Sequence, residues 1–532
     1  MREISSPLLG ISSPFGARRN PLAAYAAAGF TPKLVAAFAD EFYAKDGRKS
    51  TFSGVLEPTA TTNGTMIASD GSLKWRPHNR LTDSNDVNSG WTLSDFASTS
   101  DNLLIPDTGT SYHYIYQAAT ASVYNFTWEF EAKPEGYDFV RLFNGIVGAG
   151  VDIDLASKTF SRKNAELDDP VITDAADGYV RVKCQYIGTR TNKVFALQPM
   201  PSALGNSQFA GDGTSGVRVR KMRLYRSDLG GMVNNPDTGD SYVPTTTSAL
   251  YLLRRNHHIY NGSAWVNAGT LIDPETRTNL LLNSGGLSTQ SVTVSATPHT
   301  LHFTGTGSVT LSGAHSATLS GTGTGEENRV SLTFTPSAGT LVVTVSGTVT
   351  NAQLEEGSTP SSYIPTSGSQ VARAGEQVVI PDENISWPAG DELSIHLKFL
   401  ATYADDGGSF RPLQWASASN SIRYYIDTAS GTGQVKGFQF GPLASSSSSS
   451  GASVYSPGVN VPMNIASRHA ASSFNIAVDG SAQTENTTST GLPDLETADL
   501  QLAYTGGSMI LQEVSLWDVG IGDAGTEDAT DD

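Results

Sequence analysis

Runs in which apolar and polar side chains alternate recur along this chain, and they restrict its fold more than any other feature. Clear cases are FTWEFEAK (126–133), YVRVKCQYI (179–187), VRVRKMRLY (217–225) and ELSIHLKFLATY (392–403). Because successive side chains of a strand point to opposite faces, such runs bury one face and expose the other. Turns that contain Gly, Asp or Asn separate them. We therefore predict an all-β fold of tandem antiparallel β-sandwich (jelly-roll) domains.

Length and charge limit the domain plan and the partners. A chain of 532 residues is too long for one ordinary core. It has 34 basic and 52 acidic residues and a formal net charge of -18, which disfavours binding to nucleic acid. The single cysteine, Cys184, excludes an intrachain disulfide and a cysteine-based zinc cluster. Cys184 lies on the same strand face as Val180 and Val182, so we predict a buried thiol.

The N-terminal segment, 1–49, is predicted to be an anchor peptide with one helix. Residues 1–30 hold two Ser-Ser-Pro triplets and are expected to be extended. A helix should follow, with Thr31 as N-cap, Pro32 at its first position and Asp46-Gly47 at its end. Its apolar stripe needs cover, either from a larger structure or from the next domain. The stripe consists of Leu34, Val35, Phe38 and Phe42.

Export and membrane insertion are not expected. Prolines interrupt the apolar part of the first thirty residues, so no continuous signal-peptide core forms. No apolar run approaches the roughly 20 residues that a membrane-spanning helix needs.

Two passages share an ending, which suggests a repeated module. MRLYRSDLGGMVNNPDTGDSYVPTT (222–246) and NAQLEEGSTPSSYIPTS (351–367) both follow an alternating run and close on Tyr-(Val/Ile)-Pro-Thr. Related openings precede the modules at 69–85 and 252–284. We therefore predict a jelly roll over 50–248 and a linker with a second, smaller sandwich over 249–369.

The remaining chain is predicted to form a third sandwich over 370–519, followed by an acidic tail over 520–532. The serine run 445–450 is expected to be a flexible surface loop. The tail, GDAGTEDATDD from 522, is expected to be disordered.

The motifs of two modules resemble known families. VDIDLASKTF, DAADGYVRVKCQYIG and the exit SYVPTT resemble, in this order, the carbohydrate-binding-type jelly roll of tailed-bacteriophage structural proteins. This copy departs from that pattern at its exit, where LYRSDLGG replaces Gln-Leu-Glu-Glu-Gly. The third unit, with its NIAVDG hairpin and final SLWD, resembles the concanavalin A-like lectin/laminin-G sandwich.

These resemblances imply a phage virion protein, a tail or head fibre that binds a host-surface glycan. They also imply attachment to virion proteins through the N-terminal segment and a homotrimer. Two other readings stay open: a glycan depolymerase or glycosidase with accessory binding modules, and a non-adhesive decoration or baseplate protein.

No residue pattern predicts catalysis, a metal or a cofactor. His257-His258 lacks further ligands at metal spacing and is expected in a solvated loop. Asp152 and Asp154 lie on one strand face, whereas a glycosidase needs carboxylates on both sides of its substrate. A solvated face is the expected explanation. We predict that the chain is not an enzyme.

Aromatic and polar residues at 415–425 are the predicted ligand contacts. In SIRYYIDT, Ile422, Tyr424 and Ile426 should face the core, which leaves Arg423 and Tyr425 outside. Together with Trp415 these two residues form our candidate glycan-binding patch, since sugars stack on exposed rings. The alternatives are core packing for Trp415 and a subunit contact for Tyr425. Aromatic residues of the first sandwich are equally open candidates: Trp91, Tyr112, Tyr114 and Tyr116.

Overall fold

The computed structural model describes most of the chain. The described residues are 25, 29–119, 125–144, 150–161, 166–187, 193–203, 208–404, 409–428, 433–441, 445–450, 454–488 and 491–531. The predicted extended peptide, 1–30, lies almost entirely outside them. Among the described residues, no helix is long and apolar enough to cross a membrane.

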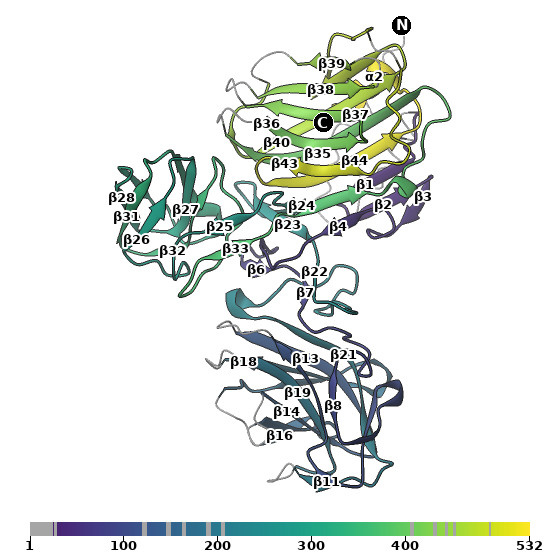
Figure 1. The fold of residues 1–532 in the computed structure, drawn as a ribbon, viewed down its shortest axis with the longest axis vertical. Helices are drawn as coiled ribbons and strands as arrows, with labels where there is room; N and C mark the ends of the chain where they lie inside the picture. The colour runs from purple at the N-terminus through teal and green to yellow at the C-terminus, as the bar shows by residue number, and fades with distance from the viewer. Residues whose placement is uncertain are drawn as a thin grey trace. The chain divides into compact units, whose positions relative to one another are not determined.

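The described chain consists of antiparallel sheets, which confirms the predicted all-β class (Figure 1). It divides into two compact units: Leu73–Leu252, here called the inserted unit, and the main unit, formed by Met1–Ser72 with Leu253–Asp532. This division is coarser than the predicted five parts, whose boundaries stay a prediction.

The inserted unit contains two six-stranded sheets with a shared apolar core. The first contains β17 (Val171–Asp174), β18 (Val180–Tyr186), β13 (Phe126–Glu135), β21 (Gly216–Arg226), β10 (Leu103–Pro106) and β9 (Phe96–Ser98). The second contains β16 (Thr159–Ser161), β15 (Gly150–Asp154), β14 (Phe139–Phe143), β19 (Lys193–Met200), β12 (Tyr114–Ala119) and β8 (Thr92–Ser94). Short strands complete the unit: β6 (Leu73–Trp75), β7 (His78–Asn79), β11 (Thr110–Ser111), β20 (Phe209–Ala210) and β22 (Leu250–Tyr251).

Alternation places the core of the inserted unit as the sequence predicted. Trp128 is buried and stacks on Tyr186, with ring centroids 5.8 Å apart. Cys184 is buried, as predicted, and its thiol contacts the carbonyl oxygen of Asp168 at 3.4 Å.

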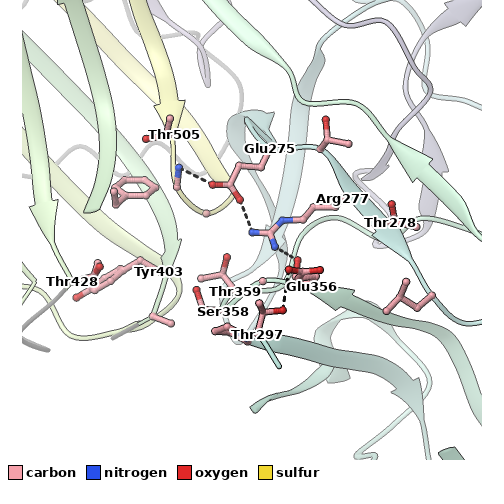
Figure 2. Close-up of a pocket in the computed structure, with 18 residues that line it drawn as sticks. Glu275, Arg277, Thr278, Thr297, Glu356, Ser358, Thr359, Tyr403, Thr428 and Thr505 are labelled. Carbon is pink, nitrogen blue, oxygen red and sulfur yellow. Dashed lines mark hydrogen bonds and ion pairs between the residues drawn. The ribbon is translucent and has the colours of Figure 1, made fainter. Parts of the chain in front are cut away.

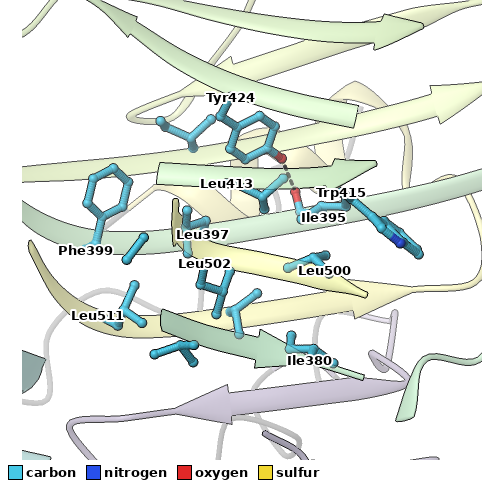
Figure 3. Packing of buried hydrophobic residues seen from close by; sticks show 14 of the residues in the cluster. Ile380, Ile395, Leu397, Phe399, Leu413, Trp415, Tyr424, Leu500, Leu502 and Leu511 are labelled. Carbon is cyan, nitrogen blue, oxygen red and sulfur yellow. Dashed lines mark hydrogen bonds between the residues drawn. The ribbon is translucent and has the colours of Figure 1, made fainter. Parts of the chain in front are cut away.

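The main unit contains a large sandwich. Its ten-stranded sheet consists of β3 (Arg48–Ser50), β2 (Phe42–Lys45), β1 (Leu34–Ala37), β44 (Met509–Trp517), β35 (Glu392–Tyr403), β40 (Gly458–Ala470), β41 (Phe474–Val478), β42 (Ser481–Ala482) and the hairpin β23 (Arg254–Tyr260) and β24 (Trp265–Ile272). The seven-stranded sheet consists of β39 (Ser445–Ser449), β38 (Gln434–Phe440), β37 (Ser421–Asp427), β36 (Ser409–Ala416), β43 (Leu500–Thr505), β34 (Gln377–Ile380) and β4 (Glu57–Thr59). Their facing side chains form one apolar core (Figure 3).

A smaller sandwich with its own apolar core completes the main unit. One sheet contains β26 (Gln290–Val294), β31 (Gly339–Ser346), β28 (Ser308–Gly313) and β29 (Ala317–Ser320). The other contains β30 (Val330–Phe334), β27 (His299–Gly305) and β32 (Val349–Glu356). The chain enters along β25 (Arg277–Asn279) and leaves along β33 (Val371–Arg373), which pair with each other.

Short 3-10 turns occur in both units, at Ser100–Asn102, Ala176–Gly178, Asp228–Gly230, Glu326–Asn328 and Asp382–Asn384.

The predicted helix at 31–46 is wrong, because this segment forms strands β1 and β2. Strand β1 pairs with β44 on one side and with β2 on the other. All four residues of β1 are buried, so the strand shows no period-two pattern by which sequence could identify it. Glu41 and Asp46 adopt positive φ angles of 51° and 50° at the two turns, where a helix would need φ near -63°.

Two further predictions are wrong. The serine run is not a loop, since Ser445–Ser449 form edge strand β39 paired with β38. The acidic tail is not disordered, since Gly522–Thr530 form helix α2. Arg468 donates to Asp523 at 2.7 Å, and the amide of Asn464 donates to the carbonyl oxygen of Thr530 at 3.0 Å. Tertiary contacts therefore order a segment whose composition favours disorder.

The two modules with repeated endings are closed by the same asparagine arrangement. In the inserted unit, the Asn79 amide donates to the carbonyl oxygens of Met222 and Val243 at 3.0 and 3.1 Å, and its oxygen accepts the N–H groups of Leu81 and Leu224. In the smaller sandwich, Asn279 does the same. Its partners are the carbonyl oxygens of Ala352 and Ile364, at 3.0 and 2.8 Å, and the N–H groups of Leu281 and Leu354.

A serine and the exit tyrosine form the second half of each closure. The Ser84 and Tyr242 hydroxyls lie 3.1 Å apart, and those of Ser284 and Tyr363 lie 2.7 Å apart. Each serine oxygen also accepts the N–H of the threonine in Tyr-(Val/Ile)-Pro-Thr, at 2.9 Å for Thr245 and 2.8 Å for Thr366. The reused endings therefore serve to fasten the last segment of a module to its first.

A buried ionic cluster joins the linker to both ends of the smaller sandwich. Arg254 lies 2.6 Å from Asp273 and 2.5 Å from Glu376, and Arg373 lies 3.1 Å from Asp273. The Ser362 hydroxyl, from the exit loop, donates to Asp273 at 2.5 Å. All these charged side chains are at most 2% exposed. Burial alone would raise the pKa of Asp273, but the two guanidinium groups and the serine hydroxyls hold it well below its usual range.

We predict that Asn279→Ala lowers the free energy of unfolding by about 3 kcal/mol, because buried donors and acceptors lose their partners. Urea denaturation of the purified chain measures the loss. Asn79→Ala should destabilise the inserted unit similarly, whereas the exposed Asn234→Ala should change stability by less than about 0.5 kcal/mol. Equal stability of Asn279→Ala and Asn234→Ala would contradict the role of the closure.

We also predict that Asp273→Asn destabilises the main unit by about 3–5 kcal/mol at neutral pH, because it leaves buried guanidinium groups unpaired. The folded-state pKa of Asp273 lies below its unfolded value of about 3.9. Its stabilisation is therefore fully present above about pH 5 and is lost as the pH falls toward the folded-state pKa. Urea midpoints measured from pH 7 to pH 3 should fall less steeply for Asp273→Asn than for the natural chain. Parallel curves would contradict this assignment.

Candidate functional site

The predicted patch maps to the seven-stranded sheet of the large sandwich, mainly to β37. Ile422, Tyr424 and Ile426 are completely buried in the core, whereas Arg423 and Tyr425 are half-buried on the opposite face. The predicted alternation of this strand is therefore confirmed. We call the face that carries Arg423 and Tyr425 the outer face of the sheet.

Trp415 does not lie on the outer face. It belongs to β36, where its Cα partner in β37 is the core residue Ile422. The side chain is 2% exposed, and its Nε1 donates to the carbonyl oxygen of Ala498 at 2.6 Å. Figure 3 shows the indole among core side chains. Trp415 therefore cannot contact a ligand together with Arg423 and Tyr425, and the structure shows the core-packing alternative for this residue.

Two phenylalanines of β38, and not Trp415, are the aromatic residues that lie beside Tyr425 on the outer face. The rings of Tyr425 and Phe438 meet edge to face, with centroids 5.0 Å apart and an interplanar angle of 80°. Phe438 and Phe440 stack with centroids 5.5 Å apart. Both phenylalanines are half-buried on the outer face, beside Lys436. The alternation in GQVKGFQFG could have identified them, because it separates Lys436, Phe438 and Phe440 from Val435 and Gly437.

Guanidinium groups lie over these rings. The Cζ atom of Arg423 lies 5.4 Å from the Phe440 centroid, and that of Arg411 lies 4.7 Å from the Tyr425 centroid. Arg411 reaches Tyr425 because β36 has a bulge between Phe410 and Leu413, where Pro412 cannot donate to the strand ladder. A bulge shifts the alternation, which explains why the sequence pattern did not identify Arg411.

We define the outer-face cluster by its half-buried members: Arg411, Arg423, Tyr425, Asp427, Lys436, Phe438 and Phe440. Lys436 and Asp427 form an ion pair of 2.6 Å. Arg423 donates to the Tyr425 hydroxyl at 3.4 Å. Chemically the cluster offers aromatic rings and cationic hydrogen-bond donors, and its one carboxylate, that of Asp427, is bound by Lys436.

A polar cleft lies elsewhere in the main unit, between the smaller sandwich and the loop ends of the large one (Figure 2). Its volume is about 850 Å³. Its charged groups bind each other: Arg277 donates to Glu275 at 2.6 Å and to the carbonyl oxygen of Glu356, whose carboxylate accepts from Thr297 at 2.9 Å. Six of the eighteen lining residues are threonines, and Leu280, Tyr403 and Phe410 also line the cleft. The cleft therefore offers hydroxyl groups, some apolar surface and charges that are already paired.

Asp152, Asp154 and His257 have structural roles. Asp152 is not on a solvated face, because it is 2% exposed and forms a two-contact ion pair with Arg141 at 2.5 and 2.8 Å. Asp154 caps the following turn by accepting the N–H groups of Ala156 and Ser157. His257 is not in a solvated loop, because it lies on β23, accepts the N–H of Ile67 at 3.2 Å, and has its pKa lowered to about 3 by burial.

A serine–histidine contact elsewhere does not form a catalytic site. Ser467 and His469 lie 2.7 Å apart, but both are completely buried in the large sandwich. The other ring nitrogen of His469 contacts the amide oxygen of Gln439, not a carboxylate. In the described part of the chain, no group of three or more His, Cys, Asp or Glu side chains could hold a metal ion.

The aromatic residues of the first sandwich separate into two environments. Trp91 is 8% exposed and packs edge to face with Phe195 in the core. Tyr114 and Tyr116 are half-buried on the other face of the sheet, with ring centroids 5.8 Å apart. Tyr112 is half-buried as well.

No protein-family model matches this sequence, and no curated protein matches it. Solved structures with partial similarity include the binding domain of botulinum neurotoxin serotype D, at 7% identity over 29% of this chain and 39% of that chain (TM-score 0.24). Another is Caenorhabditis elegans galectin LEC-6, at 14% identity over 26% of this chain and 89% of that chain (TM-score 0.20). A third is domain 4 of AbnA, a Geobacillus stearothermophilus arabinanase solved with arabinotriose, at 10% identity over 33% of this chain and 82% of that chain (TM-score 0.24). Similarity at these TM-scores carries no argument about function.

We predict that Trp415→Ala lowers the free energy of unfolding by about 3–5 kcal/mol, because it leaves a cavity in the core. Arg423→Gln, on the outer face, should cost less than about 1 kcal/mol. Urea denaturation of both variants tests the two placements. Similar losses would contradict the assignment of the two side chains to opposite faces.

Proposed function

We propose that this chain is a structural protein of a tailed-phage particle, a tail or head fibre, that binds a host-surface glycan through its β-sandwiches. The motif order in the first module and the lectin-like ending of the third unit support the phage assignment. The shared closure of two modules supports a fibre built from repeated sandwiches. The N-terminal segment would attach to the particle, and the assembly would be a homotrimer.

The outer-face cluster is the observation that carries the binding proposal. Sugars stack their apolar faces on aromatic rings and use a few polar groups for orientation. Tyr425, Phe438 and Phe440 supply rings on rigid neighbouring strands, and Arg423 supplies donors beside them. Sites on strands hold their geometry better than sites on loops.

A glycan array probed with the purified full-length chain tests this proposal. We expect binding to a bacterial surface polysaccharide, and Tyr425→Ala and Phe438→Ala should each weaken it about 10-fold, since a stacking contact contributes roughly 1–2 kcal/mol. Tyr260→Ala is the matched control, because this exposed ring lies on β23, outside the cluster. Thr505→Trp, which fills the polar cleft, should leave binding unchanged. A blank array would favour a decoration protein.

The same preparation tests the enzyme alternative. We propose that the chain turns over no polysaccharide, so incubation with the bound glycan should release no reducing ends. Release that disappears when one carboxylate is removed would establish a depolymerase instead. Labelling the chain and imaging intact particles would test the virion location separately from binding.

A further inference from the structure

We infer that the glycan held by the outer-face cluster carries anionic groups, carboxylate or phosphate, and that Arg411 and Arg423 bind them. The inference rests on the proposed glycan-binding function and adds the chemical class of the ligand.

The first observation is that the structure describes no acidic partner for either guanidinium group. Within the described part of the chain, neither Arg411 nor Arg423 is in an ion pair, and the Nε atom of each is buried without a hydrogen-bond acceptor. Other arginines of the main unit do pair with carboxylates: Arg254 with Asp273, Arg255 with Glu41, and Arg468 with Asp523.

The chain's composition makes the missing acidic partners of Arg411 and Arg423 informative. Acidic residues outnumber basic ones by 52 to 34, so a cation on this protein has carboxylates in excess. The one carboxylate of the cluster, Asp427, is already bound by Lys436 at 2.6 Å. Among the described residues, these two positive charges of the outer face therefore have no carboxylate partner, in a protein of net charge -18. An anionic ligand would neutralise them.

The second observation is how the two side chains are held. Arg411 lies over Tyr425 and Arg423 over Phe440, so ring contacts restrict both side chains before any ligand arrives. The planar guanidinium fork matches the oxygen geometry of carboxylates and phosphates and can donate two parallel hydrogen bonds. A restricted fork also loses less conformational entropy on binding.

The third observation is how the rings and the guanidinium groups are distributed over the strands of the cluster. Rings and guanidinium groups occur on three adjacent strands: Arg411 on β36, Arg423 and Tyr425 on β37, and Phe438 and Phe440 on β38. A sugar ring that stacks on Phe438 would place its substituents within reach of the neighbouring strand. A polymer with an acidic group on successive sugars can then engage both arginines.

Calorimetric titration of the full-length chain with matched probes tests the inference. The probes are oligogalacturonate, the same oligomer methyl-esterified to remove its charge, and a ribitol-phosphate oligomer. We expect binding of at least one anionic probe and at least 10-fold weaker binding of the methyl ester. The carboxylate and phosphate probes distinguish the two sources of anionic groups. Raising the salt concentration from about 0.1 to 1 M should weaken anionic binding, since the screening length falls from about 10 to 3 Å.

Arg411→Gln and Arg423→Gln should each reduce affinity for the anionic probe about 10- to 100-fold, the range for hydrogen bonds to charged groups. Arg423→Lys should recover only part of the loss, because it restores the charge without the fork. Arg48→Gln, at an exposed arginine of β3, is the matched control and should bind normally. Thermal unfolding of each variant checks that it is folded.

Two results would overturn the inference. If neutral and anionic probes bind equally and only Tyr425→Ala or Phe438→Ala weakens binding, the cluster binds glycans without charge selection, and the proposed function stands alone. If the two arginine variants bind the anionic probe like the natural chain, the anionic groups lie elsewhere. Failure of every probe and of the whole array would refute the proposed function as well.

Discussion

The main unit depends on the buried ion pairs that the carboxylate of Asp273 forms with two arginines. Asp273 lies at the end of the linker hairpin, where Arg254 and Arg373 approach it from segments far apart in the sequence. Ser362 adds a hydroxyl from the exit loop of the smaller sandwich. A charge removed from water needs partners of opposite charge and hydrogen bonds on all sides. The linker and the start and end of the smaller sandwich are therefore constrained together.

The asparagine closure solves a related problem for each module. A sandwich whose first and last segments meet away from the regular sheet leaves backbone groups without ladder partners. One buried amide supplies two donors and accepts two N–H groups at that point, in both Asn79 and Asn279. The serine and the exit tyrosine then hold the exit segment that follows the last strand. The same short motifs can thus close sandwiches that differ in size and strand number.

The outer-face cluster depends on the core behind it. Tyr424 and Trp415 fill the interior from β37 and β36, and their burial fixes which residues of these strands face outward. Arg411 is the exception, since the bulge at Pro412 turns it toward Tyr425. Binding groups on this surface are therefore positioned by packing that a ligand does not contact.

Alternation in the sequence determined the long amphipathic strands, because a strand buried on one face repeats every two residues. It placed β13, β18, β21, β35 and β37 within one or two residues and assigned Arg423 and Tyr425 to the outside. The sequence also identified two modules with the same ending, because their closing residues form a short shared motif, Tyr-(Val/Ile)-Pro-Thr.

Tertiary structure alone decided what local pattern does not encode. Strand β1 is buried on both faces and resembles a helix stripe, and only pairing with β44 makes it a strand. Helix α2 and strand β39 have compositions typical of disorder and gain order from Arg468 and from β38. Trp415 alternates like its neighbours, but which face of its sheet meets the core depends on the opposing sheet. Strand pairing and burial depend on residues far apart in the sequence. A short stretch of sequence therefore does not contain the information needed to predict them.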